Sequence, residues 1–450
     1  GEGASGPQQY QHHPGLRARL PQAPGRGRPG FTGCGGIVKT KAGGSDMTNL
    51  KHLDPWDPMR PPEESPYYWK GQPEIVKRND VRDDQLVLVD LFSGAGGFSV
   101  GFEQAGFVSA LGLDMHTAAA RTFMDRHPRA SFILGDARLV SPEILLDALN
   151  GVRPHVVTGG VPCQGFSLSN RKRNDEDPRN YLFLEFIRLA RVLDPDVLVV
   201  ENVSGIRSAA GGRFVSEIVR AMEQEGYTVK VEVLDAADFG VPQHRKRIFF
   251  VGFRPGIEFR WPRPTHGPQG EYPWVTVWEA IGDLPPLNPG EAAEEYHIPP
   301  QTEYQRRMRD GASVLYNHES PKHPAGTSER IAKTPPGEPM YESFRQRIRL
   351  HPNFPSPTIL AGGIRPQFQF GHPTQPRGLT VRELARLQSF PDSVYFHGGI
   401  VQGRVQTGNA VPPLMARALA LAIRAALEAG FDPEEHGVPL RREIAQVALF

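Results

Sequence analysis

Short apolar runs alternate with longer amphipathic stretches between residues 86 and 252. The runs are rich in Val, Leu, Ile and Phe, which is typical of strands buried on both faces of a sheet. They predict strands near 86–90, 109–113, 131–134, 156–160, 197–201, 229–234 and 247–252. Apolar residues recur at helical spacing in 99–105, 181–192 and 214–224. This alternation predicts a doubly wound, mainly parallel, seven-stranded α/β sheet with a Rossmann-like arrangement.

The chain before this region has a different composition. Residues 1–80 contain many Gly, Pro, Gln and His and little apolar periodicity, so we expect a disordered region or an extension. Met47 opens a more ordinary N-terminal sequence, so we assign no function to residues 1–46. Residues 84–253 are expected to form the main domain.

The chain after this region predicts a second, smaller domain and a return to the first. Residues 254–355 are dense in Pro, Gly, aromatic and basic residues, which predicts an irregular domain. Residues 356–430 are expected to rejoin the main domain, and 431–450 to form a tail. Within the return, Thr380 and Glu383 form a capping-box pattern for a helix, and an amphipathic helix is predicted from Leu414 to Gly430.

Composition narrows the classes of function. The 51 basic and 50 acidic residues nearly balance, so binding to nucleic acid would depend on a local basic patch. Two cysteines, Cys34 and Cys163, exclude a disulfide scaffold, and no Cys/His spacing indicates a metal site. No run of 18 apolar residues predicts a membrane span and no signal peptide is evident, so we expect a cytoplasmic protein.

Cys163 is the first candidate for chemistry. It lies in Val161–Ser167, directly after the predicted strand 156–160, where α/β enzymes place reactive groups. An isolated cysteine is most often a small buried hydrophobe. Here Gly165 lets the backbone approach a ligand, so the flanking residues favour a nucleophile.

A glycine-rich turn follows the first predicted strand. Residues 92–97 connect that strand to a helix, as in nucleotide-binding α/β domains, although the third glycine of the dinucleotide spacing is missing. Two later strands also end in an acid: Asp114 is placed to bind a ribose, and Asp136 to bind an adenine amino group. A tight turn without a ligand is the alternative.

A carboxylate ends one further predicted strand, and a basic cluster precedes another. Glu201 follows the apolar run 197–200 and would lie at the same sheet edge as Cys163; a structural carboxylate paired with an arginine is the alternative. In the segment 243–247, alternate side chains would share a face if a strand began there. A solvated basic edge is the alternative for this cluster.

In combination, these segments resemble the bacterial-type DNA (cytosine-5)-methyltransferases, which use S-adenosylmethionine. The resemblance covers roughly residues 86–430 and follows the family's order of motifs. It is carried by Phe92–Gly97, Pro162–Gln164, Glu201–Val203, Gln243–Arg247, Arg382–Pro391 and Gly408–Pro413.

The resemblance implies a reaction and its catalytic residues. Cys163 would add to C6 of a flipped-out cytosine, so that C5 becomes an enamine carbon able to accept a methyl group. Glu201 would donate a proton or a hydrogen bond to N3, while Arg245 and Arg247 line the active site.

The resemblance also implies binding residues and partners. Residues 254–355 would be the target-recognition domain for double-stranded DNA, in a monomer without a metal. A cognate restriction endonuclease would act on the same site, unless the enzyme is an orphan methylase. The implied cofactor-binding residues are Asp90, Phe92, Ser93, Gly94, Ala95, Gly96, Gly97, Asp114, Met115, Asp136, Ala137, Pro162, Asn409 and Ala410. The implied DNA-binding residues are Gln164, Ser167, Arg171, Arg173 and Gln243.

Two departures and two rival functions accompany this interpretation. Asp114 stands where the family more often has Glu, and Ala410 where it often has Ser. A sister group methylates tRNA, but its nucleophile motif usually runs Pro-Cys-Gln-Pro-Phe-Thr, whereas this chain has Gly165 and Ser167. A non-catalytic DNA-binding protein with this fold would be expected to lose the thiol or the acid first. Both are retained, which favours a DNA methylase.

Overall fold

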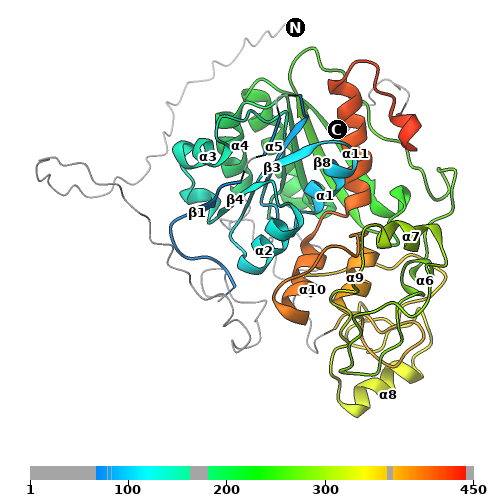
Figure 1. The fold of residues 1–450 in the computed structure, drawn as a ribbon. Coiled ribbons are helices and arrows are strands. Elements are labelled where there is room, and N and C mark those ends of the chain that lie inside the picture. Colours follow the sequence, from blue (N-terminus) through cyan, green and yellow to red (C-terminus); the bar gives the residue numbers. More distant parts are fainter. Residues whose placement is uncertain (1–66, 79, 83, 163–180, 362–367, 442–450) are drawn as a thin grey trace, which may run out of the picture. The chain divides into compact units, whose positions relative to one another are not determined.

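The computed structural model describes residues 67–78, 80–82, 84–162, 181–361 and 368–441. Its centre is an eight-stranded sheet with the order β1-β4-β3-β2-β5-β6-β8-β7 (Figure 1). The strands are β1 (Glu74–Val76), β2 (Val87–Leu91), β3 (Val108–Asp114), β4 (Ser131–Leu134), β5 (Val156–Gly160), β6 (Val197–Val203), β7 (Thr228–Asp235) and β8 (Lys246–Phe253).

The five central strands, from β4 to β6, are parallel, and β8 pairs antiparallel with both β6 and β7. All seven predicted strands are present, so the predicted α/β fold class is confirmed. The added strand, β1, pairs antiparallel with β4 and covers that edge of the sheet. The chain order reverses between β2 and β5, and such a switch point is where open α/β sheets bind ligands.

Helices cover both faces of the sheet, because successive side chains of a strand point to opposite faces. On β2, Leu88 packs with α1 and α11, whereas Val87 and Val89 pack with α3, α4 and α5. Figure 1 shows α3 and α4 on one side of the sheet and α11 on the other. These helices are α1 (Gly97–Gln104), α2 (Thr117–Arg126), α3 (Pro142–Leu149), α4 (Leu182–Leu193), α5 (Arg213–Gln224) and α11 (Pro413–Leu427).

Residues after β8 form mostly loops around short helices. The longer helices here are α6 (Val277–Ile281), α7 (Glu303–Arg309), α8 (Ala325–Lys333), α9 (Val381–Leu387) and α10 (Gly399–Asn409). Along the whole described chain, before and after β8, short 3-10 helices occur at Ala137–Leu139, Ser204–Arg207, Ala209–Gly212, Ala236–Phe239 and Pro433–His436. The predicted capping box is confirmed at α9: the Thr380 side chain accepts from the Glu383 amide at 3.1 Å, and the Glu383 carboxylate accepts from the Thr380 amide at 2.8 Å.

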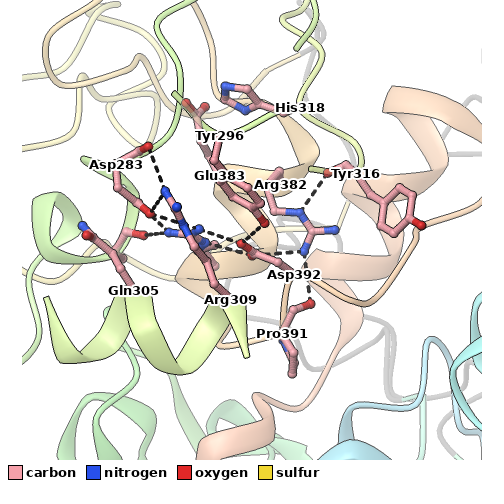
Figure 2. Close-up of polar contacts among 12 residues, drawn as sticks. Asp283, Tyr296, Gln305, Arg309, Tyr316, His318, Arg382, Glu383, Pro391 and Asp392 are labelled. Carbon is pink, nitrogen blue, oxygen red and sulfur yellow. Dashed lines mark hydrogen bonds and ion pairs between the residues drawn. The ribbon is translucent and has the colours of Figure 1, made fainter. Parts of the chain in front are cut away.

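A network of buried charges anchors α9 to this loop-rich region (Figure 2). Arg386 of α9 donates to Asp283 at 2.7 Å and to Asp392 at 2.6 Å. Arg309 of α7 pairs with Asp283 at 2.5 Å, and Tyr296 donates to Asp392 at 2.7 Å. Buried charges are tolerated only when they are paired, and each carboxylate here has at least two partners. The network therefore holds α6, α7 and α9 in one arrangement.

One apolar segment of the described chain, Gly399–Leu427, is long and hydrophobic enough to cross a membrane by composition alone. It consists of two helices, α10 and α11, which are separated at Ala410–Pro412. Of its most apolar window, 72% is buried inside the protein. The segment is therefore part of the protein core.

Helix α11 lies unusually close to α1, because glycines on α1 leave room for it. A Cβ atom added at Gly101 would lie 2.5 Å from both the Ala416 Cβ and the Pro413 carbonyl oxygen. A Cβ atom added at Gly97 would collide with the Val411 carbonyl. The last long helix thus packs directly on the first one.

We expect Gly101→Ala to destabilise the protein by about 1–3 kcal/mol, the usual cost of overpacking a filled core. The measurement is urea denaturation followed by circular dichroism. Gly326→Ala in α8 is the matched control, since nothing lies within 4 Å of the added Cβ atom there. It should be neutral or stabilising by up to about 1 kcal/mol, because alanine favours a helix over glycine. Equal stability of the two variants would contradict the tight α1–α11 contact.

Candidate active site

The glycine turn after β2 is held in an open conformation at the switch point. Phe92, Gly94 and Gly96 have positive φ values of 57°, 53° and 82°. Ser93 donates its amide to the Leu113 carbonyl at 2.9 Å, and Gly94 donates to the Asp114 carboxylate at 2.8 Å. A Cβ atom at Gly94 would meet nothing within 4 Å, so the space beside the turn is free for a ligand.

Two of the predicted acids lie at strand ends beside this turn. Asp114 ends β3, and its other oxygen accepts from the amide of His116 at 2.8 Å. His116 in turn caps α2, because its Nδ1 accepts from the Ala119 amide at 3.1 Å. Asp136 follows β4 and is engaged by Arg138, with Oδ2 2.9 Å from the arginine Nε. Asp114 therefore has its carboxylate fixed by backbone amides, whereas Asp136 has an ion-pair partner.

The third acid, Asp90, is buried within β2 under the turn. It accepts hydrogen bonds from the hydroxyls of Ser99 and Thr158, both at 2.9 Å. Burial raises the pKa of this carboxyl to about 7. The structure thus places Asp90 where it supports the turn from inside the protein, away from the open side.

The late segment of the chain returns to the same turn. Ala410 directly follows α10 and packs in one apolar cluster with Ala95 of the turn and Val100 of α1. Asn409, its neighbour, is exposed. Residues more than 300 positions apart in the sequence are thereby brought together at the turn. The cofactor-binding role of Asn409 and Ala410 stays a prediction.

A buried carboxyl lies at the adjacent strand ends. Glu201 of β6 pairs in register with Gly160, the last residue of β5. A Cβ atom on Gly160 would lie 3.5 Å from the Glu201 Oε2. Asn202 donates its side-chain amide to the Val161 carbonyl at 3.3 Å, which ties β6 to the segment leading to Pro162. Glu201 therefore lies beside the point where the chain leaves β5.

Arg247 is the partner of this carboxyl. Its Nε lies 2.9 Å from Glu201 Oε1, and both side chains are nearly buried. Burial raises the pKa of Glu201, and the charges of Arg247 and Arg245 oppose this rise only in part. A carboxyl in this setting keeps its proton to higher pH than an exposed glutamate, which suits a proton donor.

Arg245 and Gln243 have a different environment, because β8 begins only at Lys246. Gln243 is fully buried; its amide group donates to the Leu387 carbonyl at 3.1 Å, and its oxygen accepts from the Ile359 amide at 2.9 Å. Arg245 donates to the carbonyls of Ile359 at 3.0 Å and Gly408 at 2.9 Å. Both side chains join segments of the chain, so the geometry does not place Gln243 on a DNA-facing surface.

Two residues of this junction were missed by the sequence analysis. Asp235 accepts from the backbone amide of Arg245 at 2.9 Å, and Gln388 accepts from Gln243 at 2.9 Å. Gln388 also donates to the Thr407 carbonyl. The only available signal was that each is a polar residue at the end of an element, Gln388 after α9 and Asp235 at the end of β7, which does not identify a partner.

Several predicted residues lie outside the described part of the chain. These are Cys163, Gln164, Ser167, Arg171 and Arg173. Of the remaining predicted cofactor residues, Phe92, Met115 and Pro162 are half-buried, while Ser93, Ala95, Gly96, Gly97 and Ala137 are buried.

Comparison with known proteins places this geometry in context. Residues 86–425 match the family model described as C-5 cytosine-specific DNA methylase. The type II methyltransferase M1.HphI of Haemophilus parahaemolyticus is 39% identical over 350 residues, covering 75% of this chain and 86% of that protein. M.DdeI of Desulfomicrobium norvegicum is 36% identical over 369 residues, covering 74% and 87%. Among solved structures, a candidate DNA modification methyltransferase encoded within an E. coli prophage has a TM-score of 0.65 and 27% identity, covering 76% of this chain and 99% of that one.

Asp90 should make the stability of this protein depend on pH. Its pKa is about 7 in the folded chain against an ordinary 3.8, so between these values only the folded chain holds the proton. The stabilising contribution is complete below about pH 4 and lost by about pH 7, falling by about 1.4 kcal/mol per pH unit. We expect Asp90→Asn to remove this slope from the free energy of unfolding, measured by urea denaturation at a series of pH values.

The control is Asp147→Asn, which removes an exposed carboxylate paired with Lys77 and should leave the slope unchanged. A slope in Asp90→Asn equal to that of the unmodified protein would mean that the folded Asp90 is ionised throughout this range.

Proposed function

We propose a specific covalent mechanism for this protein. Its premise is that the chain belongs to the C-5 cytosine-specific DNA methylase family and is a DNA (cytosine-5)-methyltransferase. The enzyme transfers a methyl group from S-adenosylmethionine to C5 of a flipped-out cytosine in a specific double-stranded DNA sequence. Cys163 forms a transient bond to C6 of that base. Glu201, Arg245 and Arg247 complete the catalytic group.

The observation that carries this proposal is the buried Glu201–Arg247 pair at the end of β6. It lies beside Gly160, three residues before Cys163, and next to the switch point where the glycine turn opens. A buried acid is costly unless it has a task or a partner, and here the partner leaves one oxygen facing the end of β5. This arrangement supports an acid directed at a base held by Cys163.

The residues divide the reaction between them. The Cys163 thiolate adds to C6, which breaks the C5–C6 double bond and moves electron density through C4 to N3. Glu201 donates its proton to N3, so C5 becomes the nucleophilic carbon of an enamine. After the methyl group is attached to C5, the C5 proton passes to a base, the thiolate leaves C6, and the N3 proton returns to Glu201, which restores both the ring and the acid.

Arg247 holds Glu201 in place. Its fixed planar donors can also bind the cytosine O2. Arg245 acts differently. Since its two terminal nitrogens donate to the Ile359 and Gly408 carbonyls, we propose that it positions these segments behind the reacting base. Gln243 shares this positioning role and is withdrawn as a DNA contact, because its side chain is fully buried.

The residues around the turn fit S-adenosylmethionine, which when bound supplies a methyl group on a sulfonium ion. The open side of Gly94 admits a ligand to the backbone, and Asp114 presents an oriented carboxylate of the kind that binds ribose hydroxyls. Phe92 and Met115 offer half-buried apolar surface for an adenine ring, and Ala410, next to the exposed Asn409, packs against the turn. Asp136 would reach the adenine only by sharing its carboxylate with Arg138.

The wider assignments follow from the same premise. Residues 84–253 and 356–430 form the catalytic domain, and 254–355 the target-recognition domain that contacts duplex DNA. The basic segment that includes Arg171 and Arg173 would close over the DNA backbone. The relatives named above are type II methyltransferases, which supports a role beside a cognate restriction endonuclease. We propose a cytoplasmic monomer without a metal.

Mapping of 5-methylcytosine at single-base resolution tests the reaction. DNA from cells expressing this chain should carry the modification in one short sequence motif, and expression of Cys163→Ala should leave the DNA unmodified, because the covalent step is lost. Modified tRNA with unmodified DNA would redirect the assignment to RNA. Full modification by Cys163→Ala would remove Cys163 from the mechanism.

Glu201→Gln should slow methyl transfer by about 10²–10⁴-fold, the usual contribution of a general acid. Because burial raises the pKa of Glu201, the rate of the unmodified enzyme should fall as the pH rises through that pKa. The variant should lack this fall, since the amide does not titrate. Single-turnover rates across a pH series measure both effects.

Glu232→Gln on β7 is the matched control, as this glutamate pairs with Arg441 away from the proposed site. It should keep the rate and the pH profile. If Glu201→Gln altered only the affinity for DNA, the proton-donor role would be wrong.

A further inference from the structure

A β-hairpin in the loop-rich region carries an unusual basic and aromatic cluster. Its arms pair Pro339 with Ile348, and the Met340 amide donates to the Arg347 carbonyl at 2.8 Å. The tip, residues 341–346, is tightened by the Arg347 amide, which donates to the Phe344 carbonyl at 2.9 Å. We refer to residues 339–348 as the arginine hairpin.

Arg347 has a guanidinium group without a charged partner in the described part of the chain. Arg347 is only 4% exposed, and its Nε makes no hydrogen bond. The guanidinium carbon lies 4.7 Å from the centre of the Phe344 ring and 5.5 Å from that of Tyr341. Aromatic faces stabilise a cation by about 0.5–2 kcal/mol, which is less than the desolvation of an unpaired charge costs. The site is thus built to hold a cation that still lacks an anion.

A second cation reinforces this positive potential. Burial and the charge of Arg347 lower the pKa of Arg404 of α10 to about 10. Two neighbouring positive charges repel each other, so the arrangement favours a bound anion. Arg330 lies 4.5 Å above the Tyr341 ring, which adds a third positive charge beside the tip.

The hairpin is fixed to the segment that borders α10. The Leu350 amide donates to the Gly371 carbonyl, and the Gly371 amide donates to the Ile348 carbonyl, both at 2.9 Å. The adjoining residues Phe368 and Phe370 line a small cavity together with Arg404. The arginine hairpin is therefore linked to the helix whose C-cap residue, Ala410, packs against the glycine turn.

Phe344 is the exposed part of this cluster. Its side chain is 45% exposed although it is a large apolar group. An apolar ring above a buried cation offers a surface for the sugar and base edges of a nucleic acid, while the cation attracts the phosphate. Duplex DNA is the polyanion that the family activity brings to this protein.

We propose that the arginine hairpin is a DNA-contacting element, in which Arg347, assisted by Arg404, binds one backbone phosphate and Phe344 packs against the same strand. This inference rests on the proposed function, because it takes the DNA substrate as given. The proposed contact is to a phosphate and not to a base. It therefore affects how tightly and in which register the DNA is bound, but not which sequence is recognised.

The test is equilibrium binding of a fluorescent duplex by the full chain, measured by anisotropy over a series of salt concentrations. Arg347→Gln should weaken binding about 10-fold at 0.1 M salt and reduce the slope of log Kd against log salt by about 1, the effect of losing one phosphate contact. The loss should be equal for the methylated sequence motif and for an unrelated duplex. Arg347→Lys should retain most of the slope, since it keeps the charge.

Matched controls separate the contact from general effects of charge and exposure. Arg191→Gln removes an exposed arginine of α4 and should leave the slope unchanged. Phe344→Ala should weaken binding several-fold. Its control is Phe354→Ala, which removes an aromatic side chain that is 62% exposed and lies outside the arginine hairpin, and which should leave binding unchanged. Circular dichroism melting of each variant identifies any that are unfolded, and Phe344→Ala then serves in place of an unfolded Arg347 variant.

An Arg347→Gln slope equal to that of Arg191→Gln would overturn the inference, and so would a loss confined to one duplex sequence, which would indicate a base contact. In both cases DNA methylation by the unmodified chain would leave the proposed function standing. Absence of methylation and of DNA binding in the unmodified chain would instead refute the proposed function itself.

Discussion

The buried junction around Gln243 and Arg245 is the constraint on which the site depends. The chain leaves the sheet after β8 and returns only near Ile359, so the two halves of the site must be joined across a long insertion. Hydrogen bonds to the Ile359 amide and carbonyl and to the Gly408 carbonyl make this connection. Because an unmet buried donor is costly, the return of the chain to this place is strongly specified.

The second consequence of burial concerns charge. Glu201 is kept from water but has Arg247 at 2.9 Å, so its pKa is raised without the carboxyl being isolated. Asp90 is buried with hydroxyl partners alone, and its pKa rises to about 7. Two buried acids on parallel strands, with β5 between them, thus differ in whether the hydrogen-bond partner carries a charge. The one with the charged partner lies where the chemistry is proposed.

The sequence predicted the parts of the fold that buried apolar runs encode. Five of the seven predicted strands, β2 to β6, were located because they are parallel and covered on both faces, and such strands are continuously apolar. Strand β1 was missed because it is only three residues long and mostly exposed. Helix α2 was also missed: its cap is His116, which is not among the usual capping residues, so its start carried no recognisable signal.

The residues of the candidate site were likewise predictable from the sequence only in part. The placement of Glu201 near the end of β5 followed from strand ends meeting at one edge of the sheet. The roles of Gln243 and Arg245 could not be foreseen, since their partners are backbone groups of distant segments, and backbone carbonyls leave no trace in a sequence.

The close contact between α1 and α11 constrains the order in which parts of this protein can fold during synthesis. The Ala105 carbonyl at the end of α1 accepts a hydrogen bond from Arg424 of α11, 319 residues later in the chain. A nascent chain therefore leaves the ribosome with the apolar face of α1 uncovered, and that face stays open until α11, more than 300 residues later, has been made. During that interval the residues that α11 will cover are exposed apolar surface, which is the kind of surface that makes incompletely folded chains prone to aggregation.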